Sequence, residues 1–531
     1  MFYNKITKKE NNKYGQMKLK IKKRRRKKIM LKKQKGITLI ALVVTIVVLL
    51  ILAGVTISLL LDENGIISKS KDARNKWEEA QEKEQKEMDD FVKENFSDWD
   101  GKQTEMPEIK KNETTGKFDW YIYNESQMKF LANYVNNTLT EQDQKMITDN
   151  NTTVDDIAIT EGTTIYLMND LNLGATFDST GNLISGEQWI PIGATKDKTM
   201  LGTFEGNNHY ICGVYINRNE KFNGIFGNCN SVKNLTIKNS YIEGLNCTGG
   251  IAGAVRKGTV ENCHNNNTTV VLKKGDNMTV GGIVAQCTGE KIEKCTNTGT
   301  IYIEGRDSKN RSQAGGIVGI CVGKSTISGC VNKGNINSGE KAGICTGEIC
   351  GSSGTEDAVT ISNCKNEGTI NGIVTTGGIV GLLSTKGTVE QCSNTGNINI
   401  TGSGGAGIVG QTNQKNGQSN SIVRQCYNSG NISGTGWLGG IVAYFCGQSQ
   451  QGTVENCYSK GAITATNSDN GAIIGKKVQD DGNAIFNNLY YLNTIGLYAI
   501  NNNQTYESDT VKAVEDDIKT YEEFLEWIKT K

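Results

Sequence analysis

Cysteine is the residue type in this sequence that could support the most chemistry. The 531 residues include 15 cysteines, and seven of them recur at intervals of 28 to 35 residues. Outside a reducing compartment cysteines usually pair as disulfides, whereas closely spaced pairs can hold a metal ion. The total is odd, so intrachain disulfides cannot use every thiol. The recurring cysteines are Cys263, Cys295, Cys330, Cys364, Cys392, Cys426 and Cys457.

The segments around these cysteines repeat one plan. GGIAGAVRKGTVENC, GGIVAQCTGEKIEKC and GGIVGLLSTKGTVEQC are three of the copies, and phrases such as TNTGTI, VNKGNI and SNTGNI follow most of the cysteines. Each period contains three short apolar strands divided by Gly/Asn turns. One unit cannot bury its own apolar positions, so the units must stack. We predict a mainly β fold, a parallel solenoid of about eight coils with the right-handed crossover that parallel strands prefer.

Stacking decides how we interpret the seven cysteines. Equivalent residues on neighbouring coils lie about 4.8 Å apart, which is within disulfide range. Their Cβ vectors run parallel, however, and this suits the disulfide torsion poorly. We therefore predict a structural ladder of small, buried, free thiols, with disulfides as the alternative. Cys345 and Cys350 lack the second ligand pair of a zinc site, so no metal or other cofactor is expected.

Other catalytic groups are sparse. The two histidines, His209 and His264, each stand beside Asn, and neither belongs to an H-E-x-x-H zinc motif. Adjacent aspartates lie in polar segments without a partner acid predicted at catalytic separation. We therefore predict no enzymatic activity, with a polysaccharide lyase or hydrolase as the minor alternative. The aspartate pairs are at positions 155–156, 480–481 and 516–517.

The repeats resemble the GLUG motif, named for its G-L/I-x-G core, of bacterial surface and adhesin-like proteins. FEGNNHYICGVYI, followed by GIFG at 224–227, is similar to the usual first coil of that class. The resemblance covers roughly residues 160–495 and implies a β-solenoid, without specifying an activity. Some immunoglobulin-A1-specific metallopeptidases carry such repeats. Because their zinc site needs an H-E-x-x-H helix, we expect no such metallopeptidase here.

A single apolar segment precedes the repeats. From Ile37 to Leu61 the chain runs 25 residues without a charge. A helix of that length spans about 37 Å, enough to cross a hydrocarbon core of roughly 30 Å. The preceding leader holds 16 Lys/Arg against the single acidic residue Glu10. This bias predicts one crossing of the bacterial cell membrane, with a cytoplasmic N-terminus and an extracellular C-terminal domain.

The junction between leader and apolar segment resembles the N-terminus of type IV pilins and pseudopilins. It contains a basic run, then Gly36, then an apolar segment that begins ITLI. The resemblance implies that a prepilin peptidase cuts between Gly36 and Ile37 and N-methylates the new first residue. It also implies other pilin-like subunits as partners. Ala41 replaces the glutamate that the family usually has at the fifth mature position, a departure that bears on self-assembly. The alternatives are an uncleaved single-pass anchor and a true start at Met30.

Charge favours display over nucleic-acid binding. Beyond the leader the chain carries 42 basic and 55 acidic side chains, the opposite of a phosphate-binding surface. We expect membrane lipid and prepilin peptidase as partners, together with an unidentified extracellular protein or glycan, and no nucleic acid. The predicted function is adhesive or structural display of the solenoid at the cell surface.

The predicted segments follow one another along the chain. A short helix within WYIYNESQMKFLANYVNN is expected to begin at Asn124 or Ser126, and a terminal helix is expected from the spacing of Val514 to Ile528. The segments are a basic leader (1–36), a transmembrane helix (37–61), a helical stalk (62–96), a linker (97–117), an entry region (118–220), the solenoid repeats (221–475) and a C-terminal cap with its helix (476–531).

Overall fold

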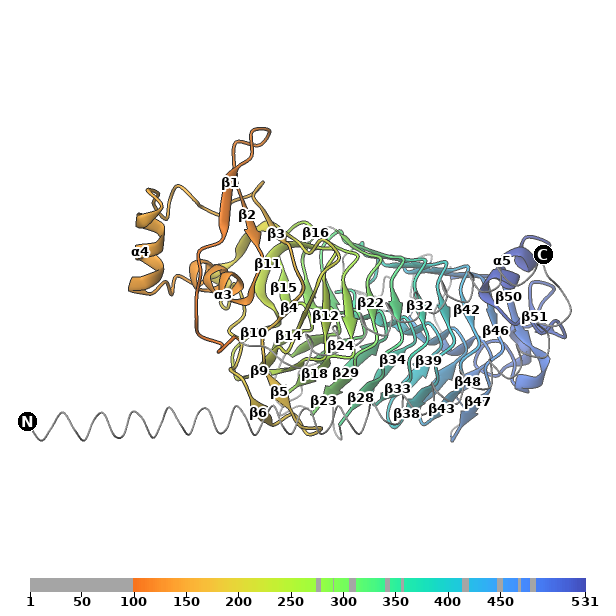
Figure 1. The fold of residues 1–531 in the computed structure, drawn as a ribbon. Helices are drawn as coiled ribbons and strands as arrows, with labels where there is room; N and C mark the ends of the chain where they lie inside the picture. The colour runs from red at the N-terminus through yellow and green to blue at the C-terminus, as the bar shows by residue number, and fades with distance from the viewer. Residues whose placement is uncertain are drawn as a thin grey trace, which may run out of the picture. The chain divides into compact units, whose positions relative to one another are not determined.

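The described residues form a parallel β-solenoid (Figure 1). This computed structural model describes residues 99–273, 278–289, 291–304, 312–339, 344–354, 358–412, 420–446, 452–466, 469–477 and 484–531. All of these residues belong to one unit of the chain. The fold confirms the predicted mainly β, parallel solenoid of stacked coils. The predicted leader, transmembrane helix and stalk lie outside the described residues, and the predicted segment boundaries stay predictions.

An antiparallel pair of strands leads into the solenoid. Strand β1 (Glu108–Lys111) pairs with β2 (Phe118–Ile122), and β2 then pairs in parallel with β3 (Thr164–Leu167). From β3 onward the chain adds parallel strands, apart from one small hairpin formed by β5 and β6. The later entry strands are β4 (Leu171–Asn172), β5 (Thr176–Phe177), β6 (Leu183–Ser185), β7 (Met200–Glu205) and β8 (Tyr210–Cys212).

Two helices accompany this entry region. Helix α3 (Glu125–Val135) begins where the sequence predicted, because the side chain of Asn124 accepts a backbone hydrogen bond from the first turn. Helix α4 (Glu141–Asp149) was not predicted. It has a capping box at Thr140, but Ile147 is its one buried apolar residue, so its sequence shows little helical periodicity.

Each coil contributes strands to three sheets. We call the nine-stranded sheet from β9 to β47 the isoleucine sheet, the nine-stranded sheet from β10 to β48 the glycine sheet, and the 31-stranded sheet the large sheet. The isoleucine sheet comprises β9 (Tyr215–Arg218), β13 (Tyr241–Gly244), β18 (Thr269–Leu272), β23 (Ile301–Ile303), β28 (Ile336–Ser338), β33 (Ile370–Gly372), β38 (Ile398–Ile400), β43 (Ile432–Gly434) and β47 (Ile463–Ala465). The glycine sheet comprises β10 (Phe222–Asn223), β14 (Cys247–Gly249), β19 (Thr279–Gly281), β24 (Ser312–Gly315), β29 (Ile344–Gly347), β34 (Thr375–Gly377), β39 (Gly404–Ala406), β44 (Trp437–Gly439) and β48 (Asn470–Gly471).

The large sheet takes up to three strands from each coil, so a full coil has five short strands rather than the predicted three. A residue with positive φ stands directly before the recurring cysteine, for example Asn262 at 51° and Asn363 at 53°. This left-handed residue bends the chain and divides one long strand into two, except at Asn456, which lies within the continuous strand β46. Its strands are β11 (Phe226–Lys233), β12 (Thr236–Lys238), β15 (Ala252–Val255), β16 (Thr259–Glu261), β17 (His264–Asn266), β20 (Val284–Cys287), β21 (Lys291–Glu293), β22 (Thr296–Asn297), β25 (Val318–Cys321), β26 (Thr326–Ser328), β27 (Val331–Asn332), β30 (Cys350–Ser352), β31 (Thr360–Ser362), β32 (Lys365–Asn366), β35 (Val380–Leu383), β36 (Thr388–Glu390), β37 (Ser393–Asn394), β40 (Val409–Thr412), β41 (Ile422–Arg424), β42 (Tyr427–Asn428), β45 (Val442–Phe445), β46 (Thr453–Ser459), β49 (Ile474–Lys477), β50 (Ile485–Leu492) and β51 (Val511–Val514), besides the entry strands β1 to β4, β7 and β8.

The interior consists of columns of similar side chains. Ile283, Ile317 and Ile379, from the repeated GGI motif, are fully buried, as are the central isoleucines of the isoleucine sheet. Limited space explains why the second residue of the GGI motif is usually glycine. A Cβ at Gly282 would lie 2.1 Å from the carbonyl oxygen of Gly316 and 2.6 Å from the Cγ of Asn297, so a larger residue there requires the neighbouring groups to shift.

The C-terminal cap differs from the prediction in one respect. Val514, the first residue of the expected helical spacing, instead ends β51 (Val511–Val514), which pairs in parallel with β50 and continues the large sheet. Helix α5 is therefore shorter, Tyr521–Ile528, with Thr520 as its N-cap. Phe524 of this helix packs on an outward column of tyrosines over the last coils, with ring centroids 6.0 and 6.4 Å away. The stacked tyrosines are Tyr427 and Tyr458.

Candidate functional site

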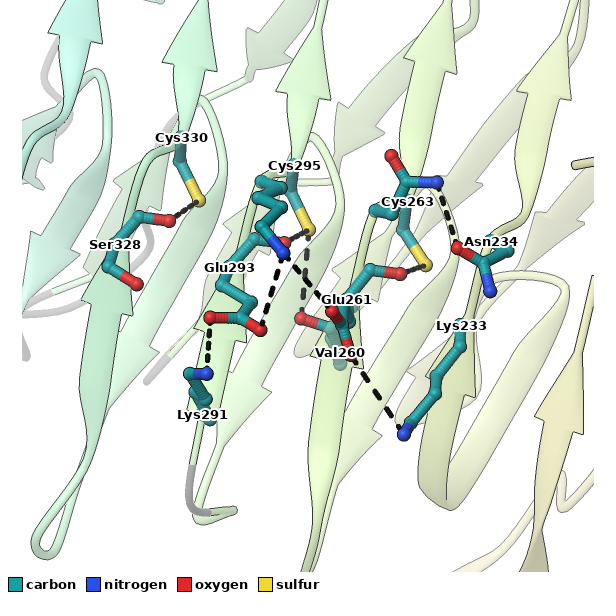
Figure 2. A network of polar contacts seen from close by, with 12 residues as sticks. Lys233, Asn234, Val260, Glu261, Cys263, Lys291, Glu293, Cys295, Ser328 and Cys330 are labelled. Carbon is teal, nitrogen blue, oxygen red and sulfur yellow. Dashed lines mark hydrogen bonds and ion pairs between the residues drawn. The ribbon is translucent and has the colours of Figure 1, made fainter.

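The seven recurring cysteines follow the middle strands of the large sheet, one per coil. Figure 2 shows Cys263, Cys295 and Cys330 on successive coils with their side chains in the same direction. The register agrees, since Glu261 pairs with Glu293 and His264 with Thr296 on either side of the first two cysteines. All seven side chains are at most 1% exposed. The thiols therefore form a column inside the solenoid.

Each thiol has carbonyl partners within that column. The Sγ of Cys295 donates to the carbonyl oxygen of Glu293 at 3.3 Å and to that of Val260 on the preceding coil at 3.8 Å. The thiols of Cys263 and Cys457 repeat both contacts. Such weak thiol hydrogen bonds satisfy the S–H group without a disulfide.

Several of the buried cysteines are neutral thiols. All 15 cysteines are free. Burial raises the pKa of Cys295, Cys364 and Cys457 well above the ordinary thiol value, because the low dielectric of the core disfavours a thiolate. The partly exposed Cys247 also has its pKa raised by burial, to about 11. Since the thiolate is the reactive form, these groups are poor nucleophiles at neutral pH. We keep the structural ladder as our interpretation.

A second column, which sequence reasoning missed, consists of buried asparagine amides. Asn297, Asn332, Asn366, Asn394 and Asn428 are fully buried. Each donates through Nδ2 to the same ladder position on the next coil, with donor–acceptor distances of 2.6 to 2.8 Å at three of the five steps. The signal was present in the x-N-x-G-x-I phrase that follows most of the recurring cysteines.

The glycine of that phrase completes the amide bonding. In one coil Asn366 Nδ2 donates to the carbonyl of Gly368 at 3.0 Å, and the N–H of Gly368 donates back to Asn366 Oδ1 at 2.8 Å. The side chain thus closes its own turn and also bonds to the next coil. Buried polar groups are tolerated when every donor and acceptor is used in this way.

One buried carboxyl interrupts the interior pattern. Glu348 occupies the position of Gly316 and Gly378 in the GGI motif and is 0% exposed. Its Oε2 accepts from Asn332 Nδ2, whereas its Oε1 has no hydrogen-bond partner within the described chain. Burial raises the pKa of this carboxyl well above its ordinary range, so the neutral acid is favoured. A buried titratable group of this kind makes stability depend on pH.

The outer side of the large sheet carries a network of opposite charges (Figure 2). Lys294 lies 3.4 Å from Glu261 and 4.0 Å from Glu293, and Lys233 lies 3.9 Å from Glu261. Hydrogen bonding from Lys291 lowers the pKa of the Glu293 carboxyl. Glu293 is therefore ionised at neutral pH and is a poor general acid. Exposed pairs of this kind contribute little to stability.

The predicted acid pairs do not form a catalytic site in the described residues. Hydrogen bonds from Thr153 lower the pKa of Asp156, while Asp516 and Asp517 hold the C-terminal cap in place. The pair at 480–481 lies outside the described residues. Within the described ranges, no group of three His, Cys, Asp or Glu side chains has the arrangement of a metal site.

The histidines have separate partners. His209 Nδ1 lies 2.9 Å from Asp170 Oδ1, and His264 Nε2 lies 3.1 Å from Asn262 Oδ1. Desolvation lowers the pKa of His264. The structure therefore does not bring the two histidines to a common partner.

The predicted processing residues Gly36, Ile37 and Ala41 lie outside the described residues. Of the helices that the structure does describe, none is long and apolar enough to cross a membrane.

Comparison with known proteins gives partial matches. No family model matches the chain. Halomucin of Haloquadratum walsbyi is 27% identical over 143 residues, which cover 26% of this chain and 2% of halomucin. A solved structure called IgA1 protease has a TM-score of 0.31 and 17% identity, covering 57% of this chain and 20% of that one. A candidate immunoglobulin A1 protease from Bacteroides ovatus has a TM-score of 0.27 and 16% identity, covering 75% and 81%.

These matches correct one prediction. We predicted that the chain has no enzymatic activity, and this is contradicted by two similar structures that are described as proteases. Catalytic acids and histidines need not stand at motif spacing in the sequence, because a solenoid can bring together side chains from different coils. The absence of a local motif therefore does not exclude an enzyme. At these TM-scores the likeness assigns no reaction to this chain.

The thiol column predicts an unusual cysteine titration. In the folded full-length chain, a thiol reagent at neutral pH should react slowly, chiefly at Cys247, and faster as the pH approaches about 11. After unfolding without reductant, all 15 cysteines should react. Absorbance from released thionitrobenzoate measures both states. A markedly smaller number of thiols after unfolding would reveal disulfides and contradict the ladder.

The buried amide column predicts a large cost for removing one of its members. Asn366→Ala leaves polar groups on Gly368 and on the adjacent coils without partners, so the free energy of unfolding should fall by about 3 kcal/mol. Asn371→Ala, at an exposed position on the isoleucine sheet, is the matched control and should change stability by about 0.5 kcal/mol or less. Urea denaturation compares the two variants, and equal losses would refute the special role of the buried amides.

Glu348 predicts a stability that falls as the pH rises. The raised pKa means that the folded state holds a proton that the unfolded state releases above its lower, ordinary pKa. The favourable contribution is therefore complete below the unfolded pKa and is lost as the pH rises through the folded one. Glu348→Gln should be more stable than wild type by at least about 1 kcal/mol at pH 8, with a smaller difference at pH 4.

Thermal unfolding at the two pH values measures this difference. The matched control is Glu367→Gln, whose carboxyl has a lowered pKa because Lys365 bonds to it. That variant should lose a little stability at high pH instead of gaining it. A pH-independent effect of Glu348→Gln would contradict the buried-acid interpretation.

Proposed function

We propose that this chain is a membrane-anchored cell-surface protein, processed at a pilin-like leader, that displays its β-solenoid for adhesion or structural contact. The observation that carries the proposal is the combination of a basic leader and a 25-residue uncharged segment with a long stacked solenoid. The first part supports anchoring with the C-terminal domain outside the cell. The second supplies an extended lateral surface.

The construction of the solenoid supports a display role. Every coil pairs with its neighbours through parallel strands, and each end carries capping structure, with β1, β2 and α3 at one end and β51 and α5 at the other. Capped ends protect strand edges from pairing with other chains. The sides therefore remain as the principal surface for contact with a protein or a glycan.

Pilin-type processing predicts the first residue of the protein in its native membrane. Intact mass and N-terminal peptide mass spectrometry should find a chain that begins at an N-methylated Ile37. Gly36→Leu should retain the leader, because the resemblance places the cut directly after this glycine. Gly54→Ala, inside the apolar segment, is the matched control and should be cleaved like wild type. A wild-type chain that keeps its leader would reject processing and leave the uncleaved single-pass anchor.

Surface display makes a separate prediction. A membrane-impermeant amine reagent added to whole cells should label lysines of the solenoid, such as Lys291 and Lys294, as detected by peptide mass spectrometry. Their side chains are 44% and 66% exposed, so they are accessible in the folded protein. Labelling that requires broken cells would contradict the proposed orientation, whatever the first residue is.

A further inference from the structure

From β23 to β43 the isoleucine sheet has an outer column of uncharged side chains. In β28, β33 and β38 the first isoleucine is fully buried, and the asparagine after it lies on the opposite side of the strand. Parallel pairing places these positions in one column across neighbouring coils. We call this column the amide face. It consists of Tyr302, Asn337, Asn371, Asn399 and Ser433.

Hydrogen bonds hold the side chains of the amide face in a fixed orientation. Asn371 Nδ2 donates to Asn337 Oδ1 at 2.8 Å, and Asn399 Nδ2 donates to Asn371 Oδ1 at 2.9 Å. Ser433 Oγ donates to Asn399 Oδ1 at 2.9 Å. The rows of side chains are therefore preorganised along the direction in which the coils stack.

These contacts leave hydrogen-bonding capacity on the exposed side. An amide has two N–H donors and two carbonyl lone pairs. The ladder uses one of each on Asn371 and on Asn399, both of which are exposed. Each amide therefore presents one further donor and one further acceptor, repeated about every 4.8 Å from coil to coil. A ligand with paired donors and acceptors at regular spacing would match this surface.

The β5–β6 hairpin covers the first strands of the isoleucine sheet, so the accessible part of the sheet begins after them. Phe177 of the β5–β6 hairpin packs on Tyr215 and Tyr241, with ring centroids 6.4 and 5.7 Å away. Figure 1 shows this hairpin beside β9, followed by a row of strands from β23 to β47. Tyr302, on β23, is 48% exposed. An aromatic ring therefore lies at one end of the amide face.

The charge of this face separates it from the large sheet. The five side chains from Tyr302 to Ser433 are uncharged. The residues directly before three of the buried isoleucines are uncharged as well, namely Asn335, Asn397 and Asn431. The large sheet, by contrast, presents the Lys/Glu network of Glu261 and Glu293. The face is uncharged, and the chain beyond the predicted leader carries more acidic than basic side chains. Neither feature attracts an acidic polymer.

We propose that the amide face binds a neutral polysaccharide along the stacking direction of the solenoid. Sugar hydroxyls both donate and accept, as the free amide groups require, and Tyr302 offers an apolar surface for one sugar ring. The five side chains span about 19 Å, long enough for several sugar residues. This inference rests on the proposed adhesive function and names the class of its ligand and the surface that binds it.

Binding by the purified full-length protein in detergent tests the inference. The probes are immobilised hexasaccharides of glucose, xylose, mannose and N-acetylglucosamine, with hexamers of galacturonate and glucosamine as charged counterparts. At least one neutral hexamer should bind, and the charged ones should bind more weakly. Asn371→Ala combined with Asn399→Ala should weaken binding of the neutral hexamer about tenfold, because two donor–acceptor pairs are lost.

Two further variants distinguish a specific face from general adhesion. Tyr302→Ala should weaken binding about threefold or more, whereas Tyr302→Phe should bind like wild type, since the ring provides the contact. Thr326→Ala combined with Thr360→Ala, on the outer side of the large sheet, is the matched control and should leave binding unchanged. Thermal midpoints confirm that the variants are folded.

Several outcomes would overturn the inference. It fails if no neutral hexamer binds, if the charged hexamers bind better, or if the double asparagine variant binds like wild type. These measurements use purified protein, so they are independent of leader cleavage and of labelling on cells. A surface-displayed protein that binds no neutral hexamer would reject the glycan inference alone, whereas glycan binding by a protein that is not exposed on cells would reject the display proposal alone.

Discussion

The spacing between neighbouring coils is the constraint on which the structure depends. Parallel strands place each residue about 4.8 Å from its equivalent on the next coil. Every interior position must therefore accept a side chain that can contact a copy of itself. Isoleucine does so by apolar packing, cysteine by a small side chain whose thiol bonds to carbonyls, and asparagine by an amide that both donates and accepts.

The same constraint explains why Glu348 is exceptional. Asparagine presents a donor to one neighbour and an acceptor to the other, so a column of buried amides can satisfy itself. An ionised carboxylate only accepts, and burial gives it no water to compensate. Glu348 stands in a position that most other coils give to glycine. It bonds to Asn332 through one oxygen and leaves the other without a partner in the described chain. It is tolerated because its raised pKa favours the neutral form.

Outward positions are free of this constraint, and there the coils diverge. At its outward positions the large sheet has lysines and glutamates on some coils and threonines on others, whereas the isoleucine sheet from β23 to β43 has amides, hydroxyls and one exposed tyrosine. Stacking turns any outward residue type that recurs into a regular row. Function in such a scaffold is therefore expected on its sides, where rows of like side chains meet a ligand, and the ends serve to close the sheets.

The sequence by itself determined the repeated plan, and with it the parallel solenoid, since units that cannot bury their own apolar residues must stack. It also limited the start of α3 to Asn124 or Ser126, of which Asn124 is the cap, because a cap acts within one turn of chain. The apolar segment and the Gly36–Ile37 junction are also identified from the sequence alone. Pilin-like processing at this junction stays a prediction.

The tertiary structure decided what depends on contacts between coils. Five strands per full coil, the bonding of the buried asparagines and the placement of Glu348 beside Asn332 all join residues that the chain separates. The length of α5 was decided in the same way, because Val514, expected in the helix, pairs with Leu492 of β50 instead. The periodicity of the sequence identifies which residues recur. Only the register between coils decides which atoms come within hydrogen-bonding distance of one another.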